Sequence, residues 1–223
     1  MIPELGHYAL VLALALGLMQ SVGPLIGAIY RDAALMRLAN STAVMQFAFV
    51  AASFLALTIC YVTSDFSVAT VSENSHSMMP LVYKISSVWG NHEGSMLLWV
   101  LILSLFGALV AIFGVNLPAS LKANVLAVQS WIACAFYIFI LLTSNPFVRL
   151  AQAPFEGRDL NPILQDPGLA IHPPLLYLGY VGFSIAFSFA IAALIDGRID
   201  AAWARWVRPW TLMAWMFLTL GIA

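Results

Sequence analysis

The sequence predicts an all-α integral membrane protein, a polytopic helix bundle. The chain has 223 residues, of which 62% are hydrophobic and only 9% are charged, and its mean hydropathy is +0.94. A soluble domain of this length needs far more charge to cover its surface. The net charge of -1 and the lack of a basic patch in the sequence exclude nucleic-acid binding.

Uncharged stretches of about 20 residues, the length of a helix that crosses a bilayer, define the expected spans. Five of them are complete: Tyr8–Ile29, Ser41–Tyr61, Ser95–Val115, Ala123–Leu142 and Pro174–Ile195. A sixth begins near Pro209 and is still apolar at Ala223, without a C-cap signal, so we expect a truncated helix rather than a short one. The sequence therefore predicts one transmembrane helical domain over residues 1–223.

The basic residues predict the orientation of the chain in the membrane. The short loops after the first, third and fifth spans carry six of them, Arg31, Arg37, Lys122, Arg198, Arg205 and Arg208. The two long loops on the opposite side, about 62–93 and 143–173, carry only Lys84, Arg149 and Arg158. The N-terminus and both long loops are therefore expected on the extracytoplasmic face, and long loops often carry function.

Polar groups within the spans are few. Gln20 and Gln46 are the strongest, and no ionisable side chain lies near the middle of a span. Ion pumps and proton relays place charged side chains there, so ion translocation is disfavoured. Hydrogen bonds between helices explain both glutamines.

The first candidate motif lies at the end of the first long loop and runs directly into a helix. It reads Trp89-Gly90-Asn91-His92-Glu93-Gly94. Glu93 in the first turn suits the helix dipole, and His92 could bond a phosphate, a propionate or only water. The alternative is the start of an interfacial helix within an aromatic belt.

The second candidate motif is the segment Asn161–Tyr177, in which His172 precedes Pro173 and Pro174. We expect His172 on a polar, proline-braced loop, where the prolines restrict the backbone. A neutral imidazole there can ligate a metal or a haem iron. A histidine that faces water at the start of a helix is the alternative.

Charged neighbours of His172 could complete such a site. Asp166 or Asp159 could orient the imidazole, and Arg149 and Arg158 could pair with carboxylates.

The two motifs also carry a resemblance to a known family. The segments VWGNHEGSMLLW and LNPILQDPGLAIHPPLLYLGYVGFS resemble the CcmF family of cytochrome c haem lyases, which includes the NrfE proteins associated with nitrite reductase. The likeness extends along the whole chain. It implies that His172 is an axial ligand to haem b received from a CcmE-like periplasmic haem chaperone, with Arg149 and Arg158 near the propionates. No ligand role is implied for His92.

The resemblance implies a role in cytochrome c-type biogenesis. A multi-pass lyase of the bacterial inner membrane would hold haem at the periplasmic face while its vinyl groups add to the CxxCH thiols of apocytochrome c, with CcmH-like thiol-handling factors as partners. The family's WWD segment and its other haem histidines would lie beyond Ala223, so no catalytic residue is assigned and the lyase is incomplete as given. Alternatives are a specialised NrfE-like lyase, a non-catalytic scaffold and a transporter subunit.

Overall fold

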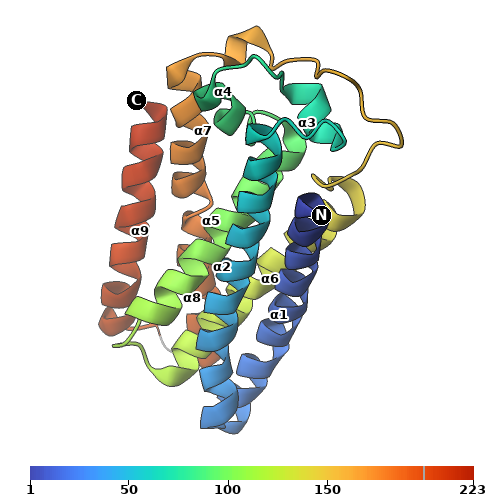
Figure 1. The fold of residues 1–223 in the computed structure, drawn as a ribbon. Helices are drawn as coiled ribbons and strands as arrows, with labels where there is room; N and C mark the ends of the chain where they lie inside the picture. The colour runs from blue at the N-terminus through green and yellow to red at the C-terminus, as the bar shows by residue number, and fades with distance from the viewer. Residues whose placement is uncertain (198) are drawn as a thin grey trace.

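The computed structural model describes residues 1–197 and 199–223, which form an elongated bundle of helices (Figure 1). Its elements are α1 (Ile2–Tyr30), α2 (Ala33–Val62), α3 (Ala69–Asn74), α4 (Leu81–Ser86), α5 (His92–Phe113), α6 (Ala119–Thr143), the 3-10 helix η1 (Pro162–Leu164), α7 (Pro167–Tyr180), α8 (Phe183–Asp196) and α9 (Ala201–Ile222). Arg198, one of the residues used to predict orientation, lies outside the described residues.

The prediction of five long apolar helices is confirmed. In the described residues α1, α2, α5, α6 and the combined segment Pro167–Asp196 are each long and apolar enough to cross a membrane. The shortest, α5, has 22 residues, which span about 33 Å as an α-helix. The orientation of these helices remains a prediction.

The fifth span differs from the single stretch expected from Pro174 to Ile195. It consists of α7 and α8, separated at Val181 and Gly182. There the amides of Ser184 and Ile185 donate to carbonyls three residues back, at 3.0 and 3.2 Å. This tighter 3-10-type turn interrupts the helix without removing it from the membrane-spanning segment.

The last helix begins earlier than expected. We predicted a start near Pro209, but α9 begins at Ala201 and Pro209 lies inside it. The carboxylate of Asp200 accepts a hydrogen bond from the Trp203 amide at 2.9 Å and caps the helix. Arg205 and Arg208 therefore lie within α9 and not in a loop, because a capped turn can carry charge that a count of uncharged residues treats as a boundary. Arg37 and Lys122, also predicted in short loops, lie near the starts of α2 and α6.

Hydrogen bonds between helices satisfy part of each buried glutamine, as predicted. The Gln20 side-chain amide donates to the Leu126 carbonyl of α6 at 2.9 Å, and the Tyr137 hydroxyl donates to Gln46 at 3.2 Å. Both glutamines are almost fully buried. They connect α1 and α2 to α6 in a medium with no water to replace a lost partner.

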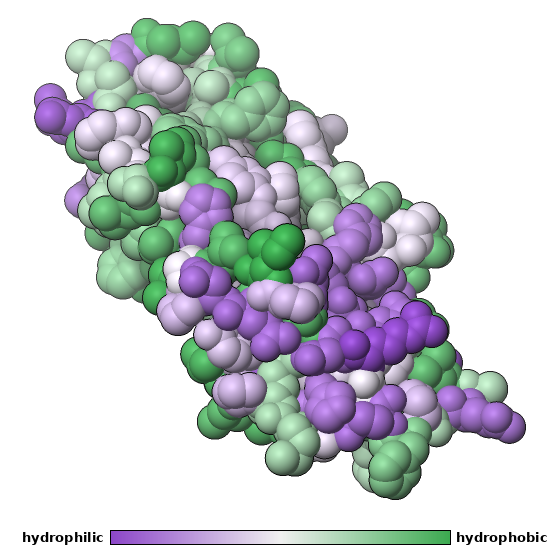
Figure 2. Space-filling model, turned by 90° about the horizontal axis from the view of Figure 1, so that it is seen from above, coloured by the Kyte–Doolittle hydropathy of each residue, from purple (hydrophilic) through white to green (hydrophobic). Residues whose placement is uncertain are grey.

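Both long interhelical segments lie at the same end of the bundle. Figure 1 shows α3, α4 and the connection from α6 to α7 gathered there, beside the N-terminus and the end of α9. Figure 2, which looks onto this end, shows hydrophilic side chains gathered in a broad region among hydrophobic ones. This end of the bundle therefore contains both candidate motifs.

Candidate functional site

Asn91 fixes the start of α5. Its Oδ1 accepts a hydrogen bond from the Gly94 amide at 2.8 Å, which caps the helix. Its Nδ2 donates to the Ser87 carbonyl at 2.7 Å and to the Tyr61 hydroxyl at 2.8 Å. Tyr61 in turn donates to the Thr70 carbonyl at 2.9 Å. The asparagine of the first motif thus ties α5 to α2 and to the segments around α3 and α4.

Gly94 allows the chain to fold closely over this start. A Cβ added to Gly94 would stand 1.6 Å from the carbonyl oxygen of Val88 and 2.8 Å from its carbonyl carbon. No side chain fits at that distance, because the obstacle is buried backbone. The turn that contains Trp89 therefore requires glycine at position 94.

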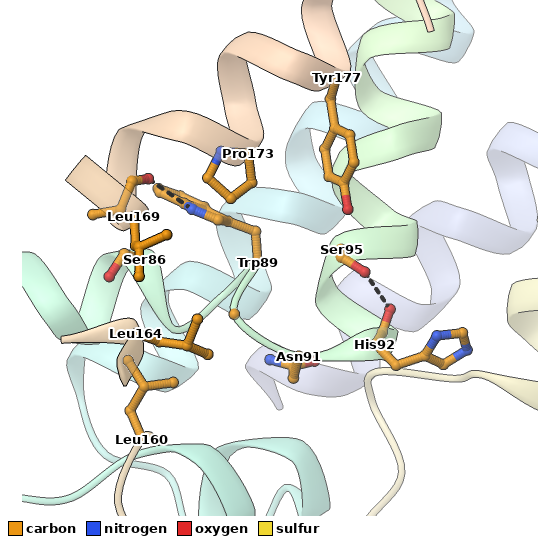
Figure 3. A pocket seen from close by; sticks show the side chains of 12 residues that line it. Ser86, Trp89, Asn91, His92, Ser95, Leu160, Leu164, Leu169, Pro173 and Tyr177 are labelled. Carbon is orange, nitrogen blue, oxygen red and sulfur yellow. Dashed lines mark hydrogen bonds between the residues drawn. The ribbon is translucent and has the colours of Figure 1, made fainter. Parts of the chain in front are cut away.

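His92 takes part in the contact between α5 and the end of α6. Its Nε2 lies 2.9 Å from the Ser144 hydroxyl, and its ring meets Phe139 edge to face with centroids 6.3 Å apart. Figure 3 shows the imidazole directed away from Trp89, Pro173 and Tyr177. His92 is thus engaged by the end of α6.

The second motif is helical at His172, which corrects the prediction that this histidine lies on a loop. Asp166 accepts hydrogen bonds from the amides of Gly168 at 2.8 Å and Leu169 at 3.1 Å through one carboxylate oxygen. Pro167 follows in the first helical position, where its missing N–H costs nothing. The cap and this proline start α7 at Pro167, so His172 lies in its second turn.

The Pro-Pro pair leaves one carbonyl of α7 without an intrahelical donor. The Ala170 carbonyl would accept from residue 174 in an α-helix or from residue 173 in a 3-10 helix, and both are prolines without an N–H. The Trp89 indole Nε1 donates to this carbonyl at 3.0 Å (Figure 3). Ala170 is only 7% exposed, and an unsatisfied buried acceptor costs about 1–3 kcal/mol.

This hydrogen bond joins the two motifs, and we did not predict it from the sequence. The signal was present, because a Pro-Pro pair inside a helix identifies the carbonyl that needs an outside donor. The donor could not be found without knowing which segment packs there.

A cavity of about 270 Å³ lies between the α5 start and α7, lined by Trp89, Pro173, Tyr177 and several leucines (Figure 3). Tyr177 also belongs to an aromatic cluster with Tyr180 and Trp99, whose ring centroids are 4.9–6.1 Å apart. The cavity is smaller than the roughly 300–1,000 Å³ of typical small-molecule sites. His172 is not among the residues that line the cavity, so a haem held by this histidine would lie on the exposed surface of the region.

His172 lies on such a surface. It shares a helical face with Leu176 and Gly179, four and seven residues later. This face meets α9, since a Cβ on Gly179 would stand 2.4 Å from the Leu218 Cα, and one on Gly221 would stand 2.8 Å from the Leu176 nitrogen. His172 itself is exposed one turn before that contact. The start of α7 lies at the end of the bundle where α9 ends (Figure 1). Within the described residues its imidazole has no hydrogen-bond partner, so both ring nitrogens are available to a ligand.

The charged residues predicted near His172 are arranged differently from one another. Arg149 pairs with Glu4 at 2.7 Å and with Asp65 at 3.4 Å, which holds the α6–α7 connection against the start of α1. Arg158 has an exposed side chain, and its backbone amide donates to the Ser72 carbonyl at 2.8 Å. Among the described residues, neither arginine forms an ion pair or hydrogen bond with the His172 motif.

The spans and the exposed histidine define a multi-pass helical membrane protein with a candidate ligand site at one end of the bundle. Residues 89–223 match the cytochrome C assembly protein family, and the match begins at Trp89. The chain therefore belongs to this family, and its relatives place it with the CcmF and CycK proteins, which confirms the predicted resemblance.

Similar proteins cover the whole chain. The cytochrome c-type biogenesis protein CycK of Bradyrhizobium diazoefficiens is 75% identical over 100% of this chain and 34% of its own length. CcmF of Pseudomonas aeruginosa is 58% identical over 100% of this chain and 34% of its own length. A solved structure of the cytochrome c heme lyase CcmF aligns with a TM-score of 0.85 and 32% identity, over 99% of this chain and 35% of that one. The chain thus spans about a third of the length of these proteins.

Proposed function

We propose that this chain forms the part of a membrane haem lyase that holds haem b, through His172, at the periplasmic face of the bacterial inner membrane. The bound haem would then be attached to the CxxCH thiols of apocytochrome c. The observation that carries the proposal is the exposed imidazole of His172. It stands on a helix start fixed by Asp166 and Trp89, in a chain whose relatives are cytochrome c-type biogenesis proteins.

The residues around His172 fit one axial position of a haem. A neutral imidazole is a common haem ligand, and exposed apolar side chains flank it, with Ile171 61% and Leu169 38% exposed. Arg158 is exposed and could pair with a propionate, whereas Arg149 would first have to leave Glu4. Because the relatives are about three times as long, the second axial ligand would come from outside these residues.

The contribution of this chain is to bind and orient, and we assign none of its residues a role in bond formation. Haem supplies the iron and the vinyl carbons that react with the thiols. The cap of α7 and the Trp89 hydrogen bond would hold the backbone of the turn that carries His172, which limits where its imidazole can meet an iron. A CcmE-like chaperone would deliver haem to this face, and CcmH-like factors would present the reduced thiols.

The test replaces His172 by alanine in the protein expressed from its complete gene with its haem chaperone. We expect loss of haem retained on purification and loss of cytochrome c maturation. His76→Ala is the matched control, because His76 is also an outer-segment histidine and lies 3.9 Å from Glu156. Haem retention and maturation that persist in the His172→Ala protein would overturn the proposal and leave a scaffold role.

A second comparison separates general maturation from a nitrite-reductase branch. The gene should complement maturation of a soluble c-type cytochrome with ordinary CxxCH sites in a strain lacking its own lyase. Complementation restricted to the nitrite reductase would assign the protein to the specialised branch.

A further inference from the structure

We propose that Trp89 is a positioning residue for His172, acting through its hydrogen bond to the Ala170 carbonyl. The inference rests on the proposed function, in which His172 binds haem. It extends that function, because it assigns to Trp89 of the first motif the position of His172 in the second motif. Trp89 itself touches neither the imidazole nor, in this proposal, the haem.

Ala170 lies two residues before His172. The Asp166 carboxylate holds the first turn of α7 through the amides of Gly168 and Leu169. The next turn contains the one carbonyl that Pro173 and Pro174 together deprive of both its α-type and its 3-10-type donor. A helix at this point can bend or open, because prolines inside helices commonly produce kinks.

Trp89 supplies the missing donor from outside the helix. Its indole bonds the Ala170 carbonyl at 3.0 Å, while its neighbour Asn91 is held by Ser87 and Tyr61. The bond therefore connects the weakened turn of α7 to a rigid element, the start of α5. Because His172 belongs to that turn, the direction of its imidazole depends on a donor 83 positions away in the sequence (172 − 89).

The perturbation is Trp89→Phe in the protein expressed from its complete gene, which keeps an aromatic ring and removes only the N–H donor. We expect amide hydrogen exchange of residues 168–172 to become about tenfold faster, which corresponds to about 1.4 kcal/mol. We also expect a shifted haem reduction potential and faster loss of haem, because the ligand is no longer held in one direction.

A second substitution provides a rescue that a general packing role would not produce. Pro174→Ala restores an N–H at the position that normally bonds the Ala170 carbonyl in an α-helix. In the P174A background, Trp89→Phe should change exchange of residues 168–172 by less than about twofold. If Trp89→Phe alone does not accumulate, the double variant should, since its carbonyl is satisfied.

Trp131→Phe is the matched control. The Trp131 indole also donates to a backbone carbonyl, that of Ser21, at 2.9 Å. Its loss should weaken the contact of α6 with α1 but leave exchange of residues 168–172 and the haem potential unchanged. If Trp131→Phe moves them as far as Trp89→Phe does, or if P174A gives no rescue, the positioning role is refuted.

These experiments also distinguish failure of this inference from failure of the proposed function. His172→Ala tests ligation without reference to Trp89, and hydrogen exchange tests the Trp89–Ala170 bond without haem. Suppose that Trp89→Phe speeds exchange of residues 168–172 and P174A rescues it, but His172→Ala retains haem. That result would refute haem ligation by His172 and with it the positioning role of Trp89, and the Trp89–Ala170 bond would be structural only. Loss of haem in His172→Ala, with no effect of Trp89→Phe on exchange of residues 168–172, would support ligation by His172 and refute the positioning role of Trp89.

Discussion

Gly94→Ala is expected to damage the start of α5 more than its small size suggests. The added Cβ would lie 1.6 Å from the Val88 carbonyl oxygen and 3.3 Å from Asn91 Oδ1. Relief requires the backbone to move, which disturbs the cap that Asn91 provides. Overpacking costs about 1–3 kcal/mol and a lost N-cap about 0.5–2 kcal/mol. We therefore expect the free energy of unfolding to fall by about 1.5–5 kcal/mol.

A second glycine of the same helix provides the control. At Gly107 an added Cβ would meet its nearest neighbour, Gln129 Cγ, at 3.8 Å, an ordinary contact. Alanine is the better helix former by about 1 kcal/mol, so Gly107→Ala should be neutral or stabilising. Unfolding of both variants is followed by intrinsic tryptophan fluorescence in the same detergent. A Gly94→Ala protein as stable as Gly107→Ala would refute the reasoning, because it would mean that the turn before α5 is not closely packed.

Three further predictions concern the polar groups at the same end of the bundle. Asn91→Asp keeps the acceptor for the Gly94 amide but loses the hydrogen bonds that the Asn91 amide nitrogen donates, and unfolding experiments should show a loss of about 2 kcal/mol. Asp166→Asn should preserve the cap of α7, whereas Asp166→Ala should lose about 1 kcal/mol and speed exchange of residues 168–172. Hydrogen bonds from Ser77 and the Gly157 amide lower the pKa of Glu156 to about 2, so its contribution is complete above pH about 4.5 and is lost as the pH falls toward about 2.

Each of these has its own decisive comparison. Asn91→Asp as stable as the native protein would mean that its bonds to Ser87 and Tyr61 are replaced by water. A haem potential shifted by Asp166→Asn would favour the predicted role of this carboxylate in orienting the imidazole over capping alone. For Glu156, proteolysis of the 145–165 segment should increase on acidification, and Glu156→Gln should remove most of that increase. If the Glu156→Gln protein is equally sensitive to acid, the acid sensitivity comes from other groups.

The spans could be predicted from the sequence because burial in lipid depends on one property, the absence of charge over about 20 residues. The ends of the helices could not, since they depend on individual caps. Asp200 starts α9 eight residues before Arg208, and Asp166 starts α7 six residues before His172. In both cases a side-chain acceptor outweighs the signals of nearby proline or arginine. The same limit explains why His172 was expected on a loop.

The candidate site could not be predicted in full, because that requires knowing which segments pack together. Each motif indicated part of a function by itself: Glu93 suggested a helix start, and His172 suggested a ligand. Their relation depends on Trp89, which sequence reasoning treated only as an interfacial aromatic residue. An indole at a membrane boundary has many possible partners, and only the fold shows that it reaches the Ala170 carbonyl.

The proline pair that follows His172 has a physical consequence for how its turn of α7 is held. A helix with a normal residue at position 174 would satisfy the Ala170 carbonyl internally, and this turn would need no donor from another helix. With Pro173 and Pro174 in place, the helical form at His172 depends on an external donor, so it is favoured when α7 lies against the α5 start. The prolines therefore make the local fold of the turn that carries His172 conditional on correct packing of the two motifs. If His172 ligates haem as proposed, haem binding would then require the assembled bundle, because only there is this turn held in place.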